Sequence, residues 1–274
     1  MHEIFSIISR LVEILTGKKL FYVKPNKHNN LGKTAVWCEL GFWYVGNVYD
    51  SADIAYGIAQ NGIVEKEDTE IVVQVLSELK KPVVYDIGAN TGYYGILAAT
   101  KFNAVVHSFE PVPAHIECIE ESSRINGIRE RILLHPIALG NHKGNFDLIL
   151  SGSGSSFKGK FLDDPNLPKM TVSVERLDAL KLPVPHFIKI DVEGYEWEVV
   201  QGASETIKSH RPICFIEIAK TFSKRNFIHQ NWNDIMHFFY SLGYKIQRST
   251  PSGLVELSEQ IPDGVQMYLF TPIK

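Results

Sequence analysis

Short, mainly apolar runs alternate with amphipathic segments through the central part of the chain. The apolar runs, which are typical of buried strands, are Val83–Ile87, Ala104–Phe109, Ile132–Ala138, His186–Ile190 and Pro212–Ile218. The segments with a helical period are Asp68–Lys80, Gly92–Thr100, Ala114–Asn126 and Tyr195–Lys208. Strands that alternate with helices in this way predict a parallel, doubly wound sheet. We expect Asp68 to be the N-cap of the first of these helices.

The last quarter of the chain follows a different pattern. A helix, predicted over Trp232–Leu242, precedes the strands Tyr244–Arg248, Leu254–Leu257 and Gln266–Phe270. Strands this close together along the chain, with no helix between them, pair antiparallel. The sequence therefore predicts an α/β fold with a mostly parallel, Rossmann-like sheet of seven strands that ends in an antiparallel pair.

A non-helical insertion separates the third and fourth predicted strands. It contains Asn145–Leu150, the Ser/Gly run Ser151–Ser156 and Thr171–Val174. The glycines of Ser151–Ser156 supply the hinge freedom that a mobile lid over a bound acceptor substrate needs. A plain surface loop explains the same run equally well.

Residues 1–65 form a predicted N-terminal extension, and residues 66–274 form the main domain. Apolar residues recur at helical spacing over residues 4–15, and the aromatic, glycine-broken stretch 36–48 predicts a hairpin whose aromatics lie in the core. We expect the extension to serve as a lid over the acceptor or as a contact in a homo-oligomer. Basic residues after the helix leave weak docking to a membrane surface as an alternative.

The composition is that of an ordinary globular protein, and it narrows the range of partners. Hydrophobic residues make up 45% and charged residues 22% of the 274 residues, and the formal net charge is −3. This charge gives no overall basic surface for nucleic acid, so we expect no such partner. Three widely spaced cysteines without a C-x-x-C pair fit a reducing compartment, and no targeting motif is found, so we expect a cytoplasmic protein.

The segment 83–95 passes from an apolar run through a turn into a predicted helix. Its glycines, Gly88, Gly92 and Gly95, are spaced G-x-x-x-G-x-x-G, whereas the dinucleotide fingerprint requires G-x-G-x-x-G. Backbone amides at such a helix start face the anionic group of a ligand. Asp86, at the strand end, is out of place for NAD but suits a ligand with an ammonium group, such as S-adenosylmethionine (SAM).

Acidic residues follow or end several of the predicted strands, where open parallel sheets bind their ligands. They are Asp86, Glu110, Asp191 and Glu217. Glu110 comes 24 positions after Asp86, a separation typical of a carboxylate that binds ribose hydroxyls. Downstream, Ala138 and Leu139 would offer an apolar wall to an adenine ring.

Two other polar residues stand inside the apolar runs. Lys189 lies in the fourth strand, and we expect it to pair with a neighbouring acid. His107 lies in the second strand, and we expect a histidine of the core instead of a proton shuttle.

Four motifs of this chain resemble those of the FkbM family of SAM-dependent methyltransferases. In chain order they are Asp86-Ile-Gly-Ala-Asn-Thr-Gly, Phe109-Glu110-Pro111, Ala138-Leu139-Gly140 and Ile188-Lys189-Ile190-Asp191-Val192-Glu193-Gly194-Tyr195-Glu196. The resemblance implies a class I methyltransferase fold, SAM as the cofactor, and methylation of a hydroxyl on a sugar, glycan or related small metabolite. With the loop and the strand ends, it places the predicted cofactor contacts at Asp86, Gly88, Asn90, Thr91, Gly92, Tyr94, Glu110, Pro111, Ala138, Leu139 and Asp191.

The predicted reaction needs the acceptor oxygen, the methyl carbon and the sulfonium sulfur on one line. A carboxylate that takes the hydroxyl proton as the new bond forms accelerates such a reaction by on the order of 10²–10⁴. We expect Asp191 in this role, with Glu193 or Glu217 orienting the acceptor hydroxyl. Alternatively, these three carboxylates hold a divalent cation that acidifies the hydroxyl, although no spacing in the sequence demands a metal.

Two other functions fit parts of the pattern. A Rossmann-like fold also serves NAD-dependent oxidoreductases, but the glycine spacing, Asp86 and the lack of a Tyr-x-x-x-Lys pair after the fourth strand argue against that activity. A non-catalytic SAM-binding scaffold is the second alternative, and it leaves the acids after the fourth strand unexplained.

Overall fold

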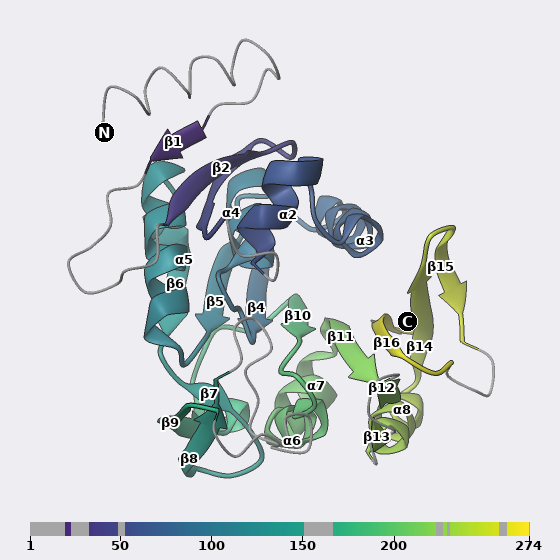
Figure 1. Cartoon of the computed structure of the whole chain (residues 1–274). Coiled ribbons are helices and arrows are strands. Elements are labelled where there is room, and N and C mark those ends of the chain that lie inside the picture. The colour runs from purple at the N-terminus through teal and green to yellow at the C-terminus, as the bar shows by residue number, and fades with distance from the viewer. Residues whose placement is uncertain are drawn as a thin grey trace.

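The structure of the chain is a computed structural model that describes residues 20–22, 33–48, 53–150, 167–222, 227–228, 231–257 and 262–273. In this part of the chain, a large mixed sheet lies between two layers of helices (Figure 1). None of the helices described there is long and apolar enough to cross a membrane. The helix expected within residues 4–15 and the run Ser151–Ser156 lie outside the described residues, so the membrane-surface contact and the lid stay predictions.

The central sheet contains eight strands in the order β15-β14-β16-β11-β10-β4-β5-β6. The parallel strands are β4 (Val83–Ile87), β5 (Val105–Phe109), β6 (Ile132–His135), β10 (Phe187–Ile190) and β11 (Ile213–Ala219). The antiparallel strands are β14 (Tyr244–Thr250), β15 (Gly253–Glu256) and β16 (Val265–Pro272). The predicted Rossmann-like α/β fold is confirmed. The sheet has eight strands instead of seven, because the predicted strand Leu254–Leu257 pairs with β14 at the sheet edge as β15.

Helices cover both faces of this sheet (Figure 1). The first layer consists of α3 (Lys66–Ser77), α4 (Tyr93–Lys101) and α5 (Pro113–Ile125), and the second of α6 (Glu196–Gly202), α7 (Ser204–His210) and α8 (Trp232–Ser241). Successive side chains of a strand point to opposite faces, so Val84 packs in the first core and Tyr85 in the second. Burial on both faces explains why the central strands are continuously apolar in sequence.

The strand order reverses between β4 and β10. From β4 the chain moves outward through β5 and β6, and then returns to β10 on the other side of β4. The loops after β4 and β10 therefore meet, and a Cβ atom on Gly88 would lie 1.9 Å from the carbonyl oxygen of Asp191. Because Gly88 also has a φ of 71°, only glycine fits at this contact.

The third predicted strand, Ile132–Ala138, is not continuous. β6 ends at His135, and Ala138–Leu139 forms β7, which pairs with β9 (Lys169–Glu175) in a separate sheet that also contains β8 (Gly144–Ile149). Pro136 has no N–H for a sheet hydrogen bond, and the Ile137 N–H donates to His135 O at 2.8 Å, which turns the chain. The small sheet is the non-helical insertion that the sequence predicts.

Two helix boundaries also differ from the predictions. The helix expected over Tyr195–Lys208 is divided into α6 and α7 at Ala203. Asp68 is not an N-cap, because α3 already begins at Lys66 after Glu65, which has a φ of 42°. Asp68 instead lies in the first turn, where its negative charge interacts favourably with the positive end of the helix dipole.

The aromatic stretch near the N-terminus forms a hairpin against the first helix layer. β2 (Thr34–Cys38) and β3 (Phe42–Gly46) pair antiparallel, β1 (Leu20–Tyr22) extends their sheet, and α2 (Ile54–Asn61) packs on it. The Trp43 N–H donates to Asn126 Oδ1 at 2.8 Å, and the Val45 N–H donates to Ser122 Oγ at 2.9 Å. Phe42 and Tyr44 are fully buried, which confirms them as core residues. The domain boundary at residue 65 stays a prediction.

Replacement of Phe239 should test the packing of α8. Its buried ring lies 4.2 Å from that of Phe270 and 5.0 Å from that of Tyr244, measured between centroids. Phe239→Ala leaves a cavity, so we expect urea unfolding to show a loss of about 3–5 kcal/mol. The neighbouring Tyr240 is 49% exposed, and Tyr240→Ala should cost less than about 1 kcal/mol. Equal losses would contradict the assigned buried face.

Candidate functional site

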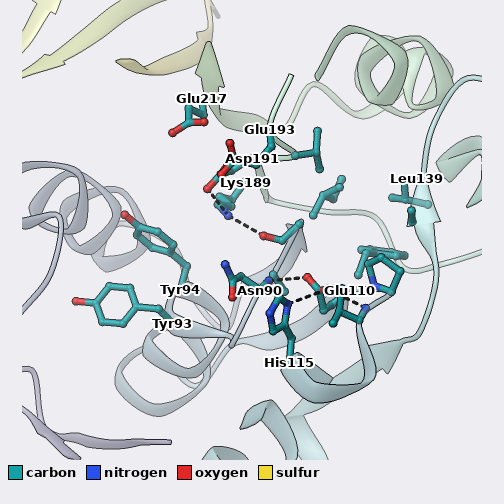
Figure 2. A pocket seen from close by; sticks show the side chains of 18 of the residues that line it. Asn90, Tyr93, Tyr94, Glu110, His115, Leu139, Lys189, Asp191, Glu193 and Glu217 are labelled. Atoms are coloured by element: carbon teal, nitrogen blue, oxygen red, sulfur yellow. Dashed lines mark hydrogen bonds and ion pairs between the residues drawn. The ribbon is translucent and has the colours of Figure 1, made fainter. Parts of the chain in front are cut away.

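A cavity opens where the loops after β4, β5 and β10 meet (Figure 2). Its walls also include the start of α4, the first turn of α5, and β7. Ten of the thirteen predicted site residues line it, namely Gly88, Asn90, Tyr94, Glu110, Pro111, Ala138, Leu139, Asp191, Glu193 and Glu217. The cavity therefore lies at the topological switch point, where open α/β sheets bind ligands.

The loop after β4 donates its backbone N–H groups inside the protein. The N–H groups of Gly88 and Ala89 both donate to Phe109 O at 3.1 Å, and the Asn90 N–H donates to Glu110 Oε2 at 2.8 Å. The prediction that the amides of this turn face an anionic ligand is therefore wrong for these three residues. Their hydrogen bonds instead join the β4 loop to the end of β5.

Glu110 lies at one end of the cavity in a fixed orientation. Besides Asn90, its carboxylate accepts a hydrogen bond from the Val112 N–H at 2.9 Å, and Oε1 lies 3.2 Å from His115 Nδ1. The apolar residues that line the cavity nearby are Phe109, Pro111, Val112, Ala138, Leu139 and Leu148. A carboxylate among apolar walls fits an adenosine, because the ribose hydroxyls can donate to the acid while the adenine packs on the walls.

Three carboxylates gather at the other end. Figure 2 shows Asp191, Glu193 and Glu217 together there, away from Glu110 and His115. Lys189 lies beneath them, and its Nζ is 3.1 Å from Asp191 Oδ2 and donates to Gly88 O at 3.0 Å. The expected pairing of Lys189 with a neighbouring acid is confirmed.

The acids beyond this ion pair hold their protons strongly. Burial, together with the negative charge of Asp191, raises the pKa of Glu193 to about 8. Burial also raises the pKa of Glu217 well above its ordinary value, and Asp191 and Glu193 act in the same direction. Glu193 and Glu217 are therefore stronger bases than ordinary carboxylates.

Asp86, a predicted cofactor contact, does not line the cavity. It is 1% exposed, and its Oδ2 accepts a hydrogen bond from the Gly95 N–H at 3.0 Å. Its other oxygen lies 3.9 Å from Lys189 Nζ. The sequence predicted an ammonium group of a ligand near Asp86. The ammonium group found there is that of Lys189.

Thr91 and Gly92 also lie outside the lining of the cavity. The Thr91 hydroxyl is hydrogen-bonded to the Tyr44 hydroxyl of β3, so it ties the loop to the N-terminal hairpin. Gly92 is the N-cap of α4 with a φ of 89°, and a Cβ atom there would lie 2.7 Å from Ile119 Cγ1. Both residues therefore shape the loop through contacts with the protein.

Several residues that line the cavity were not predicted, because no motif in the sequence marks them. The Tyr94 hydroxyl donates to Glu65 Oε2 at 2.7 Å, which brings the start of α3 to the cavity. Glu65 lies in the assigned extension, and only the tertiary fold places it here. His115 is five residues after Glu110, on the first turn of α5, and this proximity was the one available indication.

His107 belongs to the core, as predicted. It is 3% exposed, and its Nδ1 lies 2.9 Å from His135 Nε2. Burial, aided by His135, lowers its pKa to about 4. This histidine is therefore neutral at physiological pH and does not line the cavity.

The two ends of the cavity together fit SAM. Glu110 and the apolar walls suit its adenosine, and the carboxylates at the opposite end suit the positive charges of its ammonium and sulfonium groups. In the ranges of the chain given above, no group of three or more His, Cys, Asp or Glu residues is arranged to hold a metal ion.

Comparisons with known proteins point to one family. The methyltransferase FkbM domain matches residues 86–246, more than half of the chain. The hexuronic acid methyltransferase AglP of Haloferax volcanii is 27% identical over 146 residues, which cover 52% of this chain and 59% of that protein. The match thus spans less than two thirds of that relative.

Solved methyltransferase structures show a more distant likeness. Methyltransferase FkbM from Methylobacillus flagellatus KT is 18% identical, with 69% of this chain and 43% of that chain covered and a TM-score of 0.49. A TehB-like SAM-dependent methyltransferase from Corynebacterium glutamicum ATCC 13032 Kitasato is 10% identical, with coverages of 82% and 98% and a TM-score of 0.47.

Glu196 offers a test of the electrostatics beside the cavity. It is 2% exposed, accepts hydrogen bonds from the N–H groups of Val192 and Gly194, and burial raises its pKa from 4.5 to about 7. A carboxyl group with a raised folded-state pKa makes the protein less stable as the pH rises from about 4.5 to 7. Glu196→Gln removes this loss and should add up to about 3 kcal/mol of unfolding free energy at pH 8 relative to pH 4.5.

Urea unfolding of both proteins at a series of pH values measures this difference. Glu205→Gln is the matched control, because the Glu205 side chain is 67% exposed. The control should change stability by less than about 0.5 kcal/mol at every pH. A constant difference between Glu196→Gln and the wild type would contradict the raised pKa.

Proposed function

The chain belongs to the FkbM methyltransferase family, and from this premise we propose that it transfers the methyl group of SAM to a hydroxyl of a sugar or related hydroxylated acceptor. The observation that carries this proposal is a single cavity with two different ends. The end around Glu110 suits an adenosine, and the other end holds a cluster of carboxylates. The related AglP, whose name gives hexuronic acid as its substrate, supports a saccharide acceptor.

The three carboxylates have different roles in this proposal. Asp191 Oδ2 lies 3.1 Å from Lys189 Nζ, so this carboxylate is already engaged in an ion pair. Glu193 has a pKa of about 8 and is closer in basicity to what proton transfer at neutral pH requires. We therefore assign proton acceptance to Glu193, and the orientation of the acceptor hydroxyl to Asp191 and Glu217. This exchanges the roles of Asp191 and Glu193 relative to the sequence-based prediction.

The proposed step is a direct displacement. Bound SAM supplies a methyl group on a positively charged sulfur. The acceptor oxygen forms a bond to the methyl carbon as the carbon–sulfur bond breaks, and the hydroxyl proton passes to Glu193. The electron pair of the broken bond stays on sulfur, which leaves as a neutral thioether. The protein contributes mainly the alignment of the reacting atoms and the base.

Cofactor binding provides the first test. Isothermal titration calorimetry should show SAM binding with micromolar affinity and no binding of NAD. Glu110→Gln keeps the size of the side chain but replaces one acceptor oxygen with a donor group, so the ribose hydroxyls lose a partner. We expect SAM affinity to fall by roughly 10- to 100-fold.

Glu120→Gln, a change of a partly exposed side chain on α5, should leave SAM affinity unaltered. Thermal unfolding of both variants reports whether the fold is retained. Binding of NAD without SAM would refute the cofactor assignment, and full SAM affinity in Glu110→Gln would remove Glu110 from the site.

Measurement of turnover tests whether Glu193 is the proton acceptor. An acceptor is first identified by transfer of a radiolabelled methyl group to pools of glycans and hydroxylated metabolites. With this acceptor, Glu193→Gln should lower kcat by on the order of 10²–10⁴, while SAM affinity falls much less. Because Glu193 must be deprotonated to act, wild-type kcat should rise with pH and level off at or below about pH 8.

The pH profile of Glu193→Gln should be flat over the same range. Asp191→Asn is the comparison, since it removes the partner of Lys189 and should lower the unfolding free energy as well as turnover. Near-normal kcat in Glu193→Gln, combined with a complete loss in a well-folded Asp191→Asn, would return the proton-acceptor role to Asp191.

A further inference from the structure

A second cavity adjoins the first and has no role in the proposed reaction. It lies between the start of α3, the end of β14 and the start of β16. Among the residues that line it are Glu67, Asp68, Ser249, Thr250, Gln266 and Met267. Carboxylates, hydroxyls and an amide thus surround a small apolar surface, which is the chemistry that suits the hydroxyls and C–H faces of a saccharide.

Glu217 connects the two cavities. It lines both of them, and it stands opposite Met267 in the pairing of β11 with β16. The two cavities therefore adjoin at Glu217, and an acceptor that spans both would pass this residue. The second cavity is thus placed to bind the part of the acceptor that is not methylated.

The ionisable side chains along this route are mostly acids. Glu65, Asp191, Glu193 and Glu217 line the first cavity, and Glu67, Asp68 and Glu217 line the second. In the part of the chain that the structure describes, Lys189 is the one lysine or arginine that lines either cavity, and it already contacts Asp86 and Asp191. Burial raises the pKa values of Asp68 and Glu217, so a further anion beside them is unfavourable.

We propose that the second cavity binds a hydroxyl-rich part of the acceptor that carries no negative charge, so that uncharged or amino sugars are selected over uronic acids. The proposal rests on the proposed function, since it takes the first cavity as the site of methyl transfer. Asp68 and Glu67 are the specificity-determining residues, because they lie outside the first cavity and act on the distant part of the acceptor.

Three methyl glycosides that share a ring and differ in charge provide the test. Methyl glucoside, methyl glucosaminide and methyl glucuronide are titrated against the SAM-loaded protein, with binding followed by saturation-transfer NMR. We expect the first two to bind, and the glucuronide to bind about tenfold more weakly or not at all. Asp68→Lys should shift the ratio of glucuronide to glucoside affinity at least about tenfold toward the glucuronide.

Two further variants make the result specific. Glu67→Lys changes an exposed residue of the same cavity, so it keeps the test valid if Asp68→Lys fails to fold. Glu70→Lys changes a residue of α3 whose side chain is 64% exposed and which lines neither cavity. It should leave the ratio unchanged. SAM affinity should be the same in all three variants.

Several outcomes would overturn the inference. These are glucuronide binding as tight as glucoside binding in the wild type, an unchanged ratio in both cavity variants, or no binding of any of the three glycosides. In each case SAM binding can remain intact, and the proposed function then survives. Absence of SAM binding would instead refute the proposed function, and this inference with it.

Discussion

The buried ammonium group of Lys189 is the interaction on which the site depends. Its Nζ lies 3.0 Å from Gly88 O, 3.1 Å from Asp191 Oδ2 and 3.9 Å from Asp86 Oδ1. Burial alone would lower the pKa of Lys189, but the charges of Asp191 and Asp86 raise it above its ordinary value. The lysine therefore stays charged, and it holds the loops after β4 and β10 together at the switch point.

The close contact between these two loops also explains why residue 88 is a glycine. Gly88 contributes the carbonyl group that Lys189 binds, and its Cα approaches the Asp191 backbone too closely for any side chain. The Asn90 N–H then donates to Glu110, so the β4 loop is fixed from both sides. The N–H groups of Gly88, Ala89 and Asn90 donate to the end of β5 and to Glu110, so they stabilise the wall of the cavity instead of facing its contents.

Sequence reasoning could place the sheet and the cavity because strand ends follow from apolar runs. Glu110 therefore lies at one end of a single cavity, and Asp191, Glu193 and Glu217 lie at the other (Figure 2). It could not place side chains whose orientation depends on packing between distant segments. Thr91 turns toward Tyr44, and Glu65 reaches Tyr94 across the fold. The early end of β6, by contrast, could have been inferred from Pro136, because proline lacks the N–H group that a strand interior needs.

The arrangement of charges also links cofactor binding to base strength. Lys189 neutralises part of the cluster, which leaves Glu193 and Glu217 close to other acids and with raised pKa values. A positive sulfonium group bound beside them would lower those values and release protons. Glu193 would then become deprotonated mainly when the methyl donor is in place. In the proposed reaction, the buried carboxylates would thus supply a base mainly when the methyl donor is bound.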